Sequence, residues 1–195
     1  FFNIDPNSSL TISNVMSGPG TVAKIGDGLL ALYATNTYTG NTEIRAGTLA
    51  LAFEEGLGDN PPTYNAARLS LTNNGVLRAT ESFSINDPNR GIEIRGNTNL
   101  PAFVSSGGIF EVMPDVTLEI SNRITGTGQL GKIGDGTLIL SSLTNTYSGG
   151  TVIAGGTLGI RDERNLGTNP VYYAGNLTIS NGGILRALAT LSIDN

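Results

Sequence analysis

Two adjacent pairs of carboxylates are the first residues in this sequence that could do chemistry. Glu54 and Glu55 form one pair, and Asp162 and Glu163 form the other. A glycosidase needs two carboxyl groups about 5–10 Å apart across a bound sugar. When the chain is aligned with itself, Glu54 matches Glu163, but Glu55 matches Arg164. We interpret both pairs as solvated turns rather than a catalytic pair, and we predict no catalytic residue.

Two glycine-rich motifs could hold an ion or a phosphate group. The motif IGDG at Ile25–Gly28 and Ile133–Gly136 resembles one fragment of a calcium-binding repeat, but no nine-residue period surrounds it. The loops at Gly18–Gly20 and Gly126–Gly128 lack the Lys-Ser/Thr and the helix of a phosphate-binding loop. An Asp between glycines can bond its own backbone in a turn. We therefore expect turns, with no metal and no cofactor.

Two tyrosines recur in register, Tyr38 and Tyr147. An exposed tyrosine ring could stack on a sugar, so these residues are candidate ligand contacts. In the alternative interpretation each ring packs over a turn with its hydroxyl in solvent. The sequence leaves both alternatives open.

The composition excludes several classes of function. The chain of 195 residues has no histidine and no cysteine, so it has neither imidazole nor thiolate chemistry. Its net charge is −5 and its 11 Lys and Arg residues are scattered, which is not typical of a nucleic-acid-binding protein. No apolar run approaches the roughly 20 residues that a membrane-spanning helix needs. We therefore expect no nucleic-acid partner and no membrane span in this stretch.

The chain repeats itself at a spacing of 108 residues. KIGDG occurs at Lys24–Gly28 and again at Lys132–Gly136, and LTNNGVLRA at Leu71–Ala79 matches ISNGGILRA at Ile179–Ala187. The sequence therefore predicts two copies of one unit, at residues 1–108 and an incomplete 109–195. We expect one continuous solenoid cut from a longer array.

The elements that position these residues are predicted to be short strands. Apolar-polar-apolar triplets such as Leu30–Leu32, Leu49–Leu51 and Leu69–Leu71 recur between Gly, Asn, Asp and Pro clusters. The only helix candidate is Ala52–Leu57. The chain is therefore all-β, and short strands with 27 glycines favour a right-handed parallel β-helix over the alternative of tandem β-sandwich domains. At about 20–22 residues per coil and about 4.8 Å between strands, one unit would form about five coils.

One polar motif occurs once in each unit. NTYTGNTEIRAGTLAL begins at Asn36, and NTYSGGTVIAGGTLGI begins at Asn145. We predict that Asn-Thr-Tyr-x-Gly forms a turn, that Ile44 begins an inward-facing strand, and that a glycine turns the next corner. The predicted turn residues are Asn36, Gly40, Gly47, Asn145, Gly149 and Gly156.

The stretch KIGDGTLILSSLTNTYSGGTVIAGGTL at Lys132–Leu158 closely resembles the autotransporter-associated β-strand repeat, also called the passenger-associated transport repeat. The first copy is a more diverged match, with Leu29 in place of the motif Thr and Asn41 in place of its second Gly. The resemblance implies a right-handed parallel β-helix in an exported bacterial surface protein. It supplies no catalytic residues.

We therefore expect a non-catalytic structural segment of an extracellular bacterial surface or fibre protein, an adhesin or passenger stalk. The expected partners are neighbouring repeats, including end-to-end or lateral self-association into filaments. The alternatives are a face that binds glycans or a host protein and, third, a carbohydrate-active β-helix enzyme.

Overall fold

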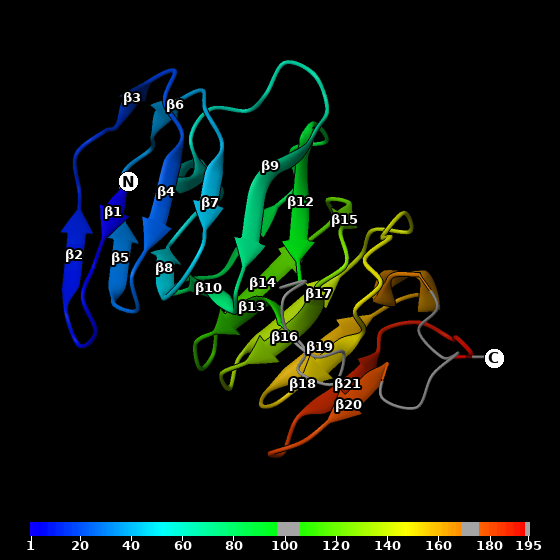
Figure 1. Ribbon diagram of the computed structural model, residues 1–195. Coiled ribbons are helices and arrows are strands. Elements are labelled where there is room, and N and C mark those ends of the chain that lie inside the picture. Colours follow the sequence, from blue (N-terminus) through cyan, green and yellow to red (C-terminus); the bar gives the residue numbers. More distant parts are fainter. Residues whose placement is uncertain (97–105, 169–175, 194–195) are drawn as a thin grey trace.

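The computed structural model describes residues 1–96, 106–168 and 176–193, and it shows a parallel β-helix (Figure 1). Each turn of the chain is a coil that lies against the next, and every strand pairing among the described residues is parallel. The β-helix prediction is confirmed. The sandwich alternative is wrong, because a β-sandwich pairs its strands antiparallel.

The coils have three sides. The first side is a six-stranded sheet of β1 (Phe2–Asn3), β4 (Val22–Ile25), β7 (Thr42–Ile44), β9 (Asn65–Thr72), β12 (Arg90–Arg95) and β15 (Ile124–Thr125). The second side is an eight-stranded sheet of β2 (Ser9–Ile12), β5 (Leu29–Leu32), β8 (Thr48–Leu51), β10 (Gly75–Ala79), β13 (Gly107–Val112), β16 (Gln129–Ile133), β18 (Thr151–Ile153) and β20 (Leu177–Ile179).

The third side is less regular. It begins with β3 (Ser17–Gly18) and β6 (Thr37–Tyr38), which pair with each other. The short 3-10 helix η1 (Glu54–Leu57) follows. The remainder is a five-stranded sheet of β11 (Phe83–Ile85), β14 (Thr117–Ile120), β17 (Thr137–Leu140), β19 (Thr157–Ile160) and β21 (Ile184–Ala187). A second 3-10 helix, η2 (Glu163–Leu166), follows β19.

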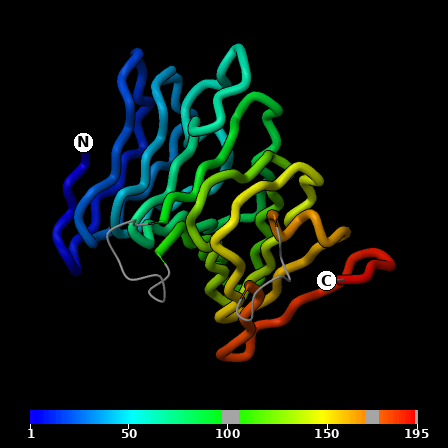
Figure 2. The backbone as a smooth tube through the Cα atoms, turned by 45° about the vertical axis from the view of Figure 1, so that its right-hand side comes forward, coloured from blue at the N-terminus to red at the C-terminus, as the bar shows by residue number. Residues whose placement is uncertain are grey.

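Aliphatic rows fill the interior of the coils. Because side chains alternate across a strand, every second residue points inward. On the second side Leu30, Leu49, Leu77 and Phe110 stand in register on successive coils, and none is exposed. Burying each such side chain stabilises the fold by about 1.5–3 kcal/mol. The core is therefore continuous along the solenoid axis. Figure 2 shows the backbone winding around this axis from coil to coil.

The two copies of the sequence unit lie on different sides of the solenoid. The KIGDG strand is β4 of the first side in the first copy and β16 of the second side in the second copy. In the same way β5 on the second side corresponds to β17 on the third. From β4 to β16 the chain passes four full coils and one further side. Each unit is therefore turned by one side, a third of a coil, relative to its neighbour.

This count corrects the expectation of about five coils per unit. Thr42 pairs with Leu69, and Leu69 pairs with Ile92, so these two coils take 27 and 23 residues. The next coil, from Ile92 to its partner Ile124, takes 32 residues. Long corner loops lengthen the coils, and fewer coils fit into one unit.

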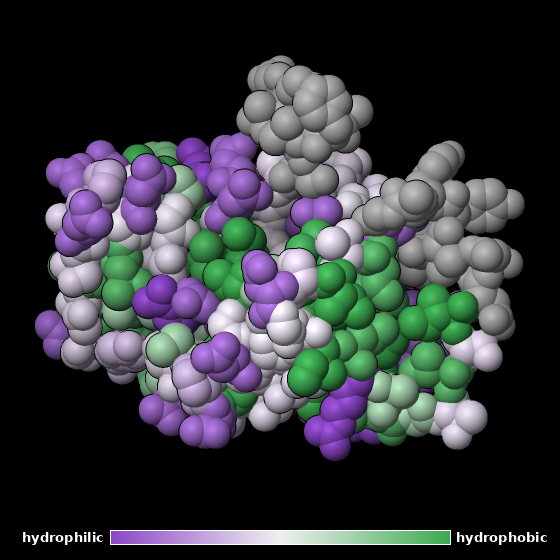
Figure 3. Space-filling view, turned by 90° about the horizontal axis from the view of Figure 1, so that it is seen from below, coloured by the Kyte–Doolittle hydropathy of each residue, from purple (hydrophilic) through white to green (hydrophobic). Residues whose placement is uncertain are grey.

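The outer surface of the second side is apolar in its C-terminal half. Figure 3, viewed from below, shows apolar side chains gathered toward that half of the molecule. Ile109, Ile133, Val152 and Ala154 line a shallow hollow there with a volume of about 220 Å³.

Candidate functional site

The two KIGDG corners are each built around a buried lysine. The Lys24 Nζ donates to the carbonyl oxygens of Ile25, Gly26 and Ala46, at 3.0, 2.6 and 3.2 Å. Lys132, which is not exposed, donates to the equivalent carbonyls of the second copy, at 2.9, 2.8 and 3.2 Å. In both corners the ammonium group donates to three backbone carbonyl oxygens.

Burial lowers the pKa of both lysines. It lowers the pKa of Lys132 to about 8, although the charges of Asp135 and Glu111 act in the opposite direction. The pKa of Lys24 is also lowered by burial, and Asp27 opposes that shift.

The predicted turn glycines lie where a side chain would not fit. Gly47 and Gly156 have φ angles of 64° and 58°, and a Cβ would stand 2.4 Å from the carbonyl oxygens of Gly26 and Gly134. A Cβ on Gly40 or Gly149 would stand 2.3 Å from backbone atoms of the preceding coil. These glycines are required by close backbone approach, and at two of them by positive φ as well.

The asparagines of the motif tie successive coils together. Asn36 accepts the Met16 N–H at 2.9 Å and donates to the Gly56 carbonyl at 2.9 Å. Asn145 accepts the Ile124 N–H at 2.9 Å and donates to the Asn165 carbonyl at 2.8 Å. Each one therefore satisfies buried backbone groups on the coils before and after it.

Tyr38 and Tyr147 are packing residues of the corner. They are 2% and 0% exposed. Their hydroxyls bond the hydroxyls of Thr42 and Thr151 at 2.7 and 2.8 Å, so they are not in solvent. Burial raises the pKa of both tyrosines, and the hydrogen bond to the threonine opposes that shift. Neither ring offers a face to a sugar in this structure, so the arrangement does not support the ligand-contact interpretation.

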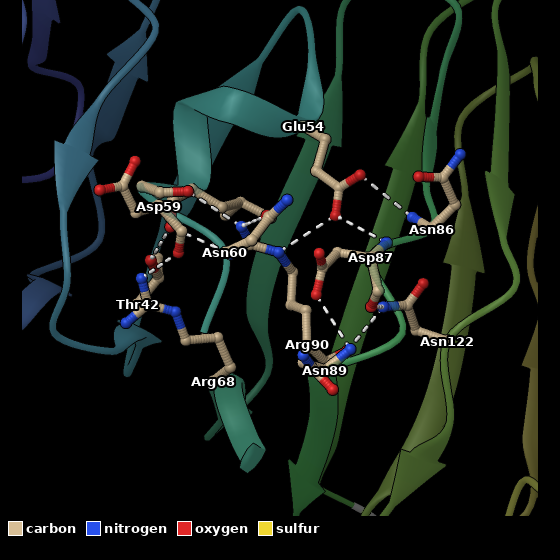
Figure 4. Close-up of polar contacts among 12 residues, drawn as sticks. Thr42, Glu54, Asp59, Asn60, Arg68, Asn86, Asp87, Asn89, Arg90 and Asn122 are labelled. Carbon is tan, nitrogen blue, oxygen red and sulfur yellow. Dashed lines mark hydrogen bonds and ion pairs between the residues drawn. The ribbon is translucent and has the colours of Figure 1, made fainter. Parts of the chain in front are cut away.

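Two arginines that are buried side by side were not predicted as site residues. Arg68 and Arg90 are 1% and 0% exposed and lie between η1 and strands β9 and β12 (Figure 4). Arg68 donates to the carbonyl oxygens of Tyr38, at 3.1 Å, and Asp59, at 2.5 Å, and also to those of Thr39 and Gly40. Burial and the neighbouring Arg90 lower the pKa of Arg68.

Arg90 holds η1 from a later coil. Its Nε donates to Glu54 Oε1 at 3.1 Å, and its guanidinium also donates to the carbonyls of Leu57 and Gly58 at 3.1 and 2.9 Å and to Asn60 Oδ1 at 2.8 Å. Glu54, the first of the candidate carboxylates, also accepts the backbone N–H groups of Asn86 and Asp87. The Glu54 carboxylate is therefore engaged in holding the fold.

The second candidate pair, Asp162 and Glu163, belongs to η2 and its N-cap. Asp162 forms an ion pair with Arg164 at 2.8 Å at the start of η2. Hydrogen bonds from the side chain and the backbone N–H of Arg164 lower the pKa of Asp162 to about 2. The self-alignment is confirmed in space, because η1 and η2 occupy equivalent corners of the two copies. Across residues 1–96, 106–168 and 176–193, no three His, Cys, Asp or Glu side chains are grouped as metal ligands.

A groove with a volume of about 440 Å³ lies beside the arginine cluster. Tyr64, Asn86 and Pro88 of the first copy line it on one side. From the second copy it is lined by Ser121, Asn122, Arg123, Ser142 and Thr144. The groove therefore lies where the two units meet. Sequence reasoning missed it, because its residues come from four successive coils.

The part of the chain that the structure describes contains no helix long and apolar enough to cross a membrane.

Comparison with known proteins gives two findings. The profile of the passenger-associated-transport-repeat family matches residues 22–51 and 130–160, the two corners with buried lysines. The Adhesin BmaC autotransporter of Brucella suis biovar 1 (strain 1330) is 32% identical over 188 residues, which are 93% of this chain and 5% of that protein. The chain thus spans about a twentieth of the length of this relative. No solved structure matches the chain.

The matched residues are those whose packing repeats in both copies. They include each buried lysine, each Asn-Thr-Tyr segment and each close-packed glycine. The prediction that Asn-Thr-Tyr-x-Gly forms a turn is wrong in the first copy, because Thr37–Tyr38 is strand β6 and pairs with β3. The chain carries two passenger-associated transport repeats, at residues 22–51 and 130–160.

Proposed function

We propose that this chain is a segment of an exported passenger at a bacterial surface, where it serves as a non-catalytic stalk or adhesin body. The observation that carries the proposal is the continuous core: aliphatic rows run through successive coils without a break between the two units. A rod of this kind works mechanically, because each coil buries the apolar face of its neighbour and pairs its backbone groups. The adhesin relative and the repeat family support export and surface exposure.

The proposed partners are further repeats stacked on the two ends. At the first end Leu10 is 39% exposed, whereas its counterpart Leu118 is fully buried. At the other end Ile179 is 49% exposed, whereas its counterpart Leu71 is fully buried. Each end therefore presents apolar residues that are buried wherever another coil covers them, together with unpaired strand edges.

Electron microscopy of the full-length protein tests the stalk. The expected result is an elongated particle whose length grows with the number of repeats. Globular particles would contradict the proposal. A chain of this size alone should give a rod-like scattering profile in solution.

A pair of end variants tests self-association separately. We expect the chain to associate end to end at high concentration, because heterologous contacts between open ends form filaments. Leu10→Lys and Ile179→Lys should abolish this association in analytical ultracentrifugation. Leu143→Lys is the matched control, since Leu143 is 48% exposed but lies away from both ends. If only the control variant abolishes association, side-by-side contact replaces the end-to-end proposal.

A further inference from the structure

The groove at the junction of the two units combines features of a binding site that the scaffold does not need. Its volume of about 440 Å³ is in the range of small-ligand pockets. Most of the repeated polar side chains in this solenoid bond backbone groups of the neighbouring coils. The groove residues Tyr64, Asn122 and Arg123 are different, and each one offers a distinct kind of contact.

Asn122 supplies an unpaired acceptor. It is only 5% exposed, and its Nδ2 donates to the carbonyls of Asp87 and Arg90 at 2.5 and 2.6 Å. These two acceptors fix the orientation of the amide, so Oδ1 is the remaining atom, and it has no hydrogen-bond partner in the described chain. In Figure 4 the amide lies directly below Asn86, another residue of the groove wall. Two other buried asparagines, Asn36 and Asn145, both use Oδ1 to accept a backbone N–H.

Arg123 supplies a free cation. It is exposed, and the only hydrogen bond of its side chain among the described residues is a 3.3 Å contact with the Thr146 hydroxyl. No ion pair in the described chain includes it. In the first copy the equivalent position, after the same Ser-Asn pair, holds Val15. The repeat therefore does not require an arginine here, and a guanidinium pairs best with a carboxylate.

Tyr64 supplies an aromatic surface. Its side chain is 45% exposed in the loop before β9. Pro88, which is also exposed, lines the groove from the corner before β12. Ser121, Asn86 and Thr144 add exposed hydroxyl and amide groups. An aromatic ring beside polar donors and acceptors suits a flat molecule with one apolar face and many hydroxyls.

We propose that this groove binds a saccharide that carries a carboxylate, such as a uronic or sialic acid. The carboxylate pairs with Arg123, and the C–H face of the sugar packs on Tyr64. A ring hydroxyl lies over the amide of Asn122, whose Oδ1 is buried in the unliganded chain. Arg123 is the only charged side chain in the groove wall, so neutral sugars lose the strongest contact. The inference does not depend on the stalk proposal, because a stalk without this ligand is still a stalk.

Saturation-transfer NMR of the purified chain tests the site. The probes are 3′-sialyllactose and a glucuronic-acid disaccharide, with lactose as the neutral reference, each at millimolar concentration. At least one acidic probe should bind at least tenfold more tightly than lactose. Arg123→Gln should remove that preference, and Tyr64→Ala should weaken binding several-fold. Arg95→Gln and Tyr33→Ala are matched controls at exposed positions outside the groove, and both should bind like the parent.

Three outcomes would overturn the inference. The first is that neither acidic probe binds. The second is that lactose binds as tightly as both acidic probes. The third is that the double variant Tyr64→Ala/Arg123→Gln, with an unchanged melting temperature, binds as well as the parent, which would place the ligand elsewhere. Electron microscopy of the full-length protein, which tests the stalk, is unaffected by any of these outcomes.

Discussion

The two short 3-10 helices occupy equivalent corners of the two units but are held in different ways. In η2, Asp162 accepts the Arg164 N–H at 3.0 Å, and Asn165 Oδ1 accepts the N–H groups of Arg161 and Asp162 at 2.8 and 3.0 Å. This is a local capping box. In η1 the residues at these places are Phe53 and Gly56, and Phe53 provides no side-chain cap.

Arg90 replaces the missing cap of η1 from a coil further along the chain. It bonds the carbonyls of Leu57 and Gly58 and pairs with Glu54. One turn is therefore stabilised by its own residues, and the other depends on the packing of a later strand. The comparison teaches that the repeat conserves the path of the chain, while the contacts that secure the path differ between copies.

The largest expected effect comes from removing the distant support of η1. Arg90→Leu leaves Glu54 Oε1, Asn60 Oδ1 and two buried carbonyls without their donor. Breaking a buried charged network costs about 3–5 kcal/mol. Urea unfolding should show a loss of this size, and hydrogen exchange should speed up first in η1, with η2 still protected.

Arg95→Leu is the matched control for Arg90→Leu. Its side chain is 58% exposed and pairs with Glu93 at the surface. The expected loss is below about 1 kcal/mol, as for exposed ion pairs. If the two variants lose equal stability, or if η2 opens together with η1, the contrast between a local and a distant support fails.

The lysine corners test the opposite expectation, that the copies behave alike. Lys24 and Lys132 each donate to three backbone carbonyls at equivalent positions of the two copies, although the two lysines lie on different sides of the solenoid. Lys24→Met and Lys132→Met should each cost about 1–3 kcal/mol, because each leaves buried carbonyls unpaired. Urea denaturation should give similar losses for the two variants. A loss of stability in only one of the two variants would show that the side of the solenoid on which the lysine lies affects stability more than the corner motif does.

Much of this fold is visible in the sequence, because its determinants are local. The inward strands and the turn at Gly47 follow from residue spacing and from glycine. Ile44 faces inward as predicted, although it ends β7 rather than beginning a strand. Asn73 and Asn181, which recur in register, both adopt positive φ, at 50° and 48°. Such features need no knowledge of the neighbouring coils.

The remaining features depend on how coils stack. Charged residues are rarely buried, so nothing local marks Arg68 and Arg90 as core residues. The recurrence of Lys24 as Lys132 was a usable signal, since a solvated lysine need not repeat. The turn of one side per unit depends on loop lengths, which strand patterns do not reveal. The groove depends on that stacking too, because its walls come from four coils.

The local cap of η2 can be tested by removing its amide. Asn165 accepts two backbone N–H groups and donates to the Ser142 carbonyl at 2.8 Å, and it is not exposed. Asn165→Ala should cost about 1–2 kcal/mol, the usual range for a lost cap. Hydrogen exchange should speed up at η2 and leave η1 unchanged. Asn181→Ala is the control for general loss of an asparagine, and faster exchange at η2 in that variant would contradict the assignment.

The smallest expected effect separates the two turns by pH. The pKa of Asp162 is lowered to about 2 by its hydrogen bonds to Arg164, below the ordinary value of 3.8. A carboxylate whose pKa is lower in the folded chain stabilises the fold above its unfolded pKa. This contribution is complete above about pH 4 and is lost as pH falls through about 2.

The amide of Arg164, which bonds Asp162, should therefore shift in NMR spectra over this range. The Gly58 amide of η1 bonds a backbone carbonyl, the Glu55 oxygen, so it is the reference and should not follow that titration. Asp162→Asn should remove the transition at Arg164. If the transition persists in that variant, the cap of η2 is not what titrates.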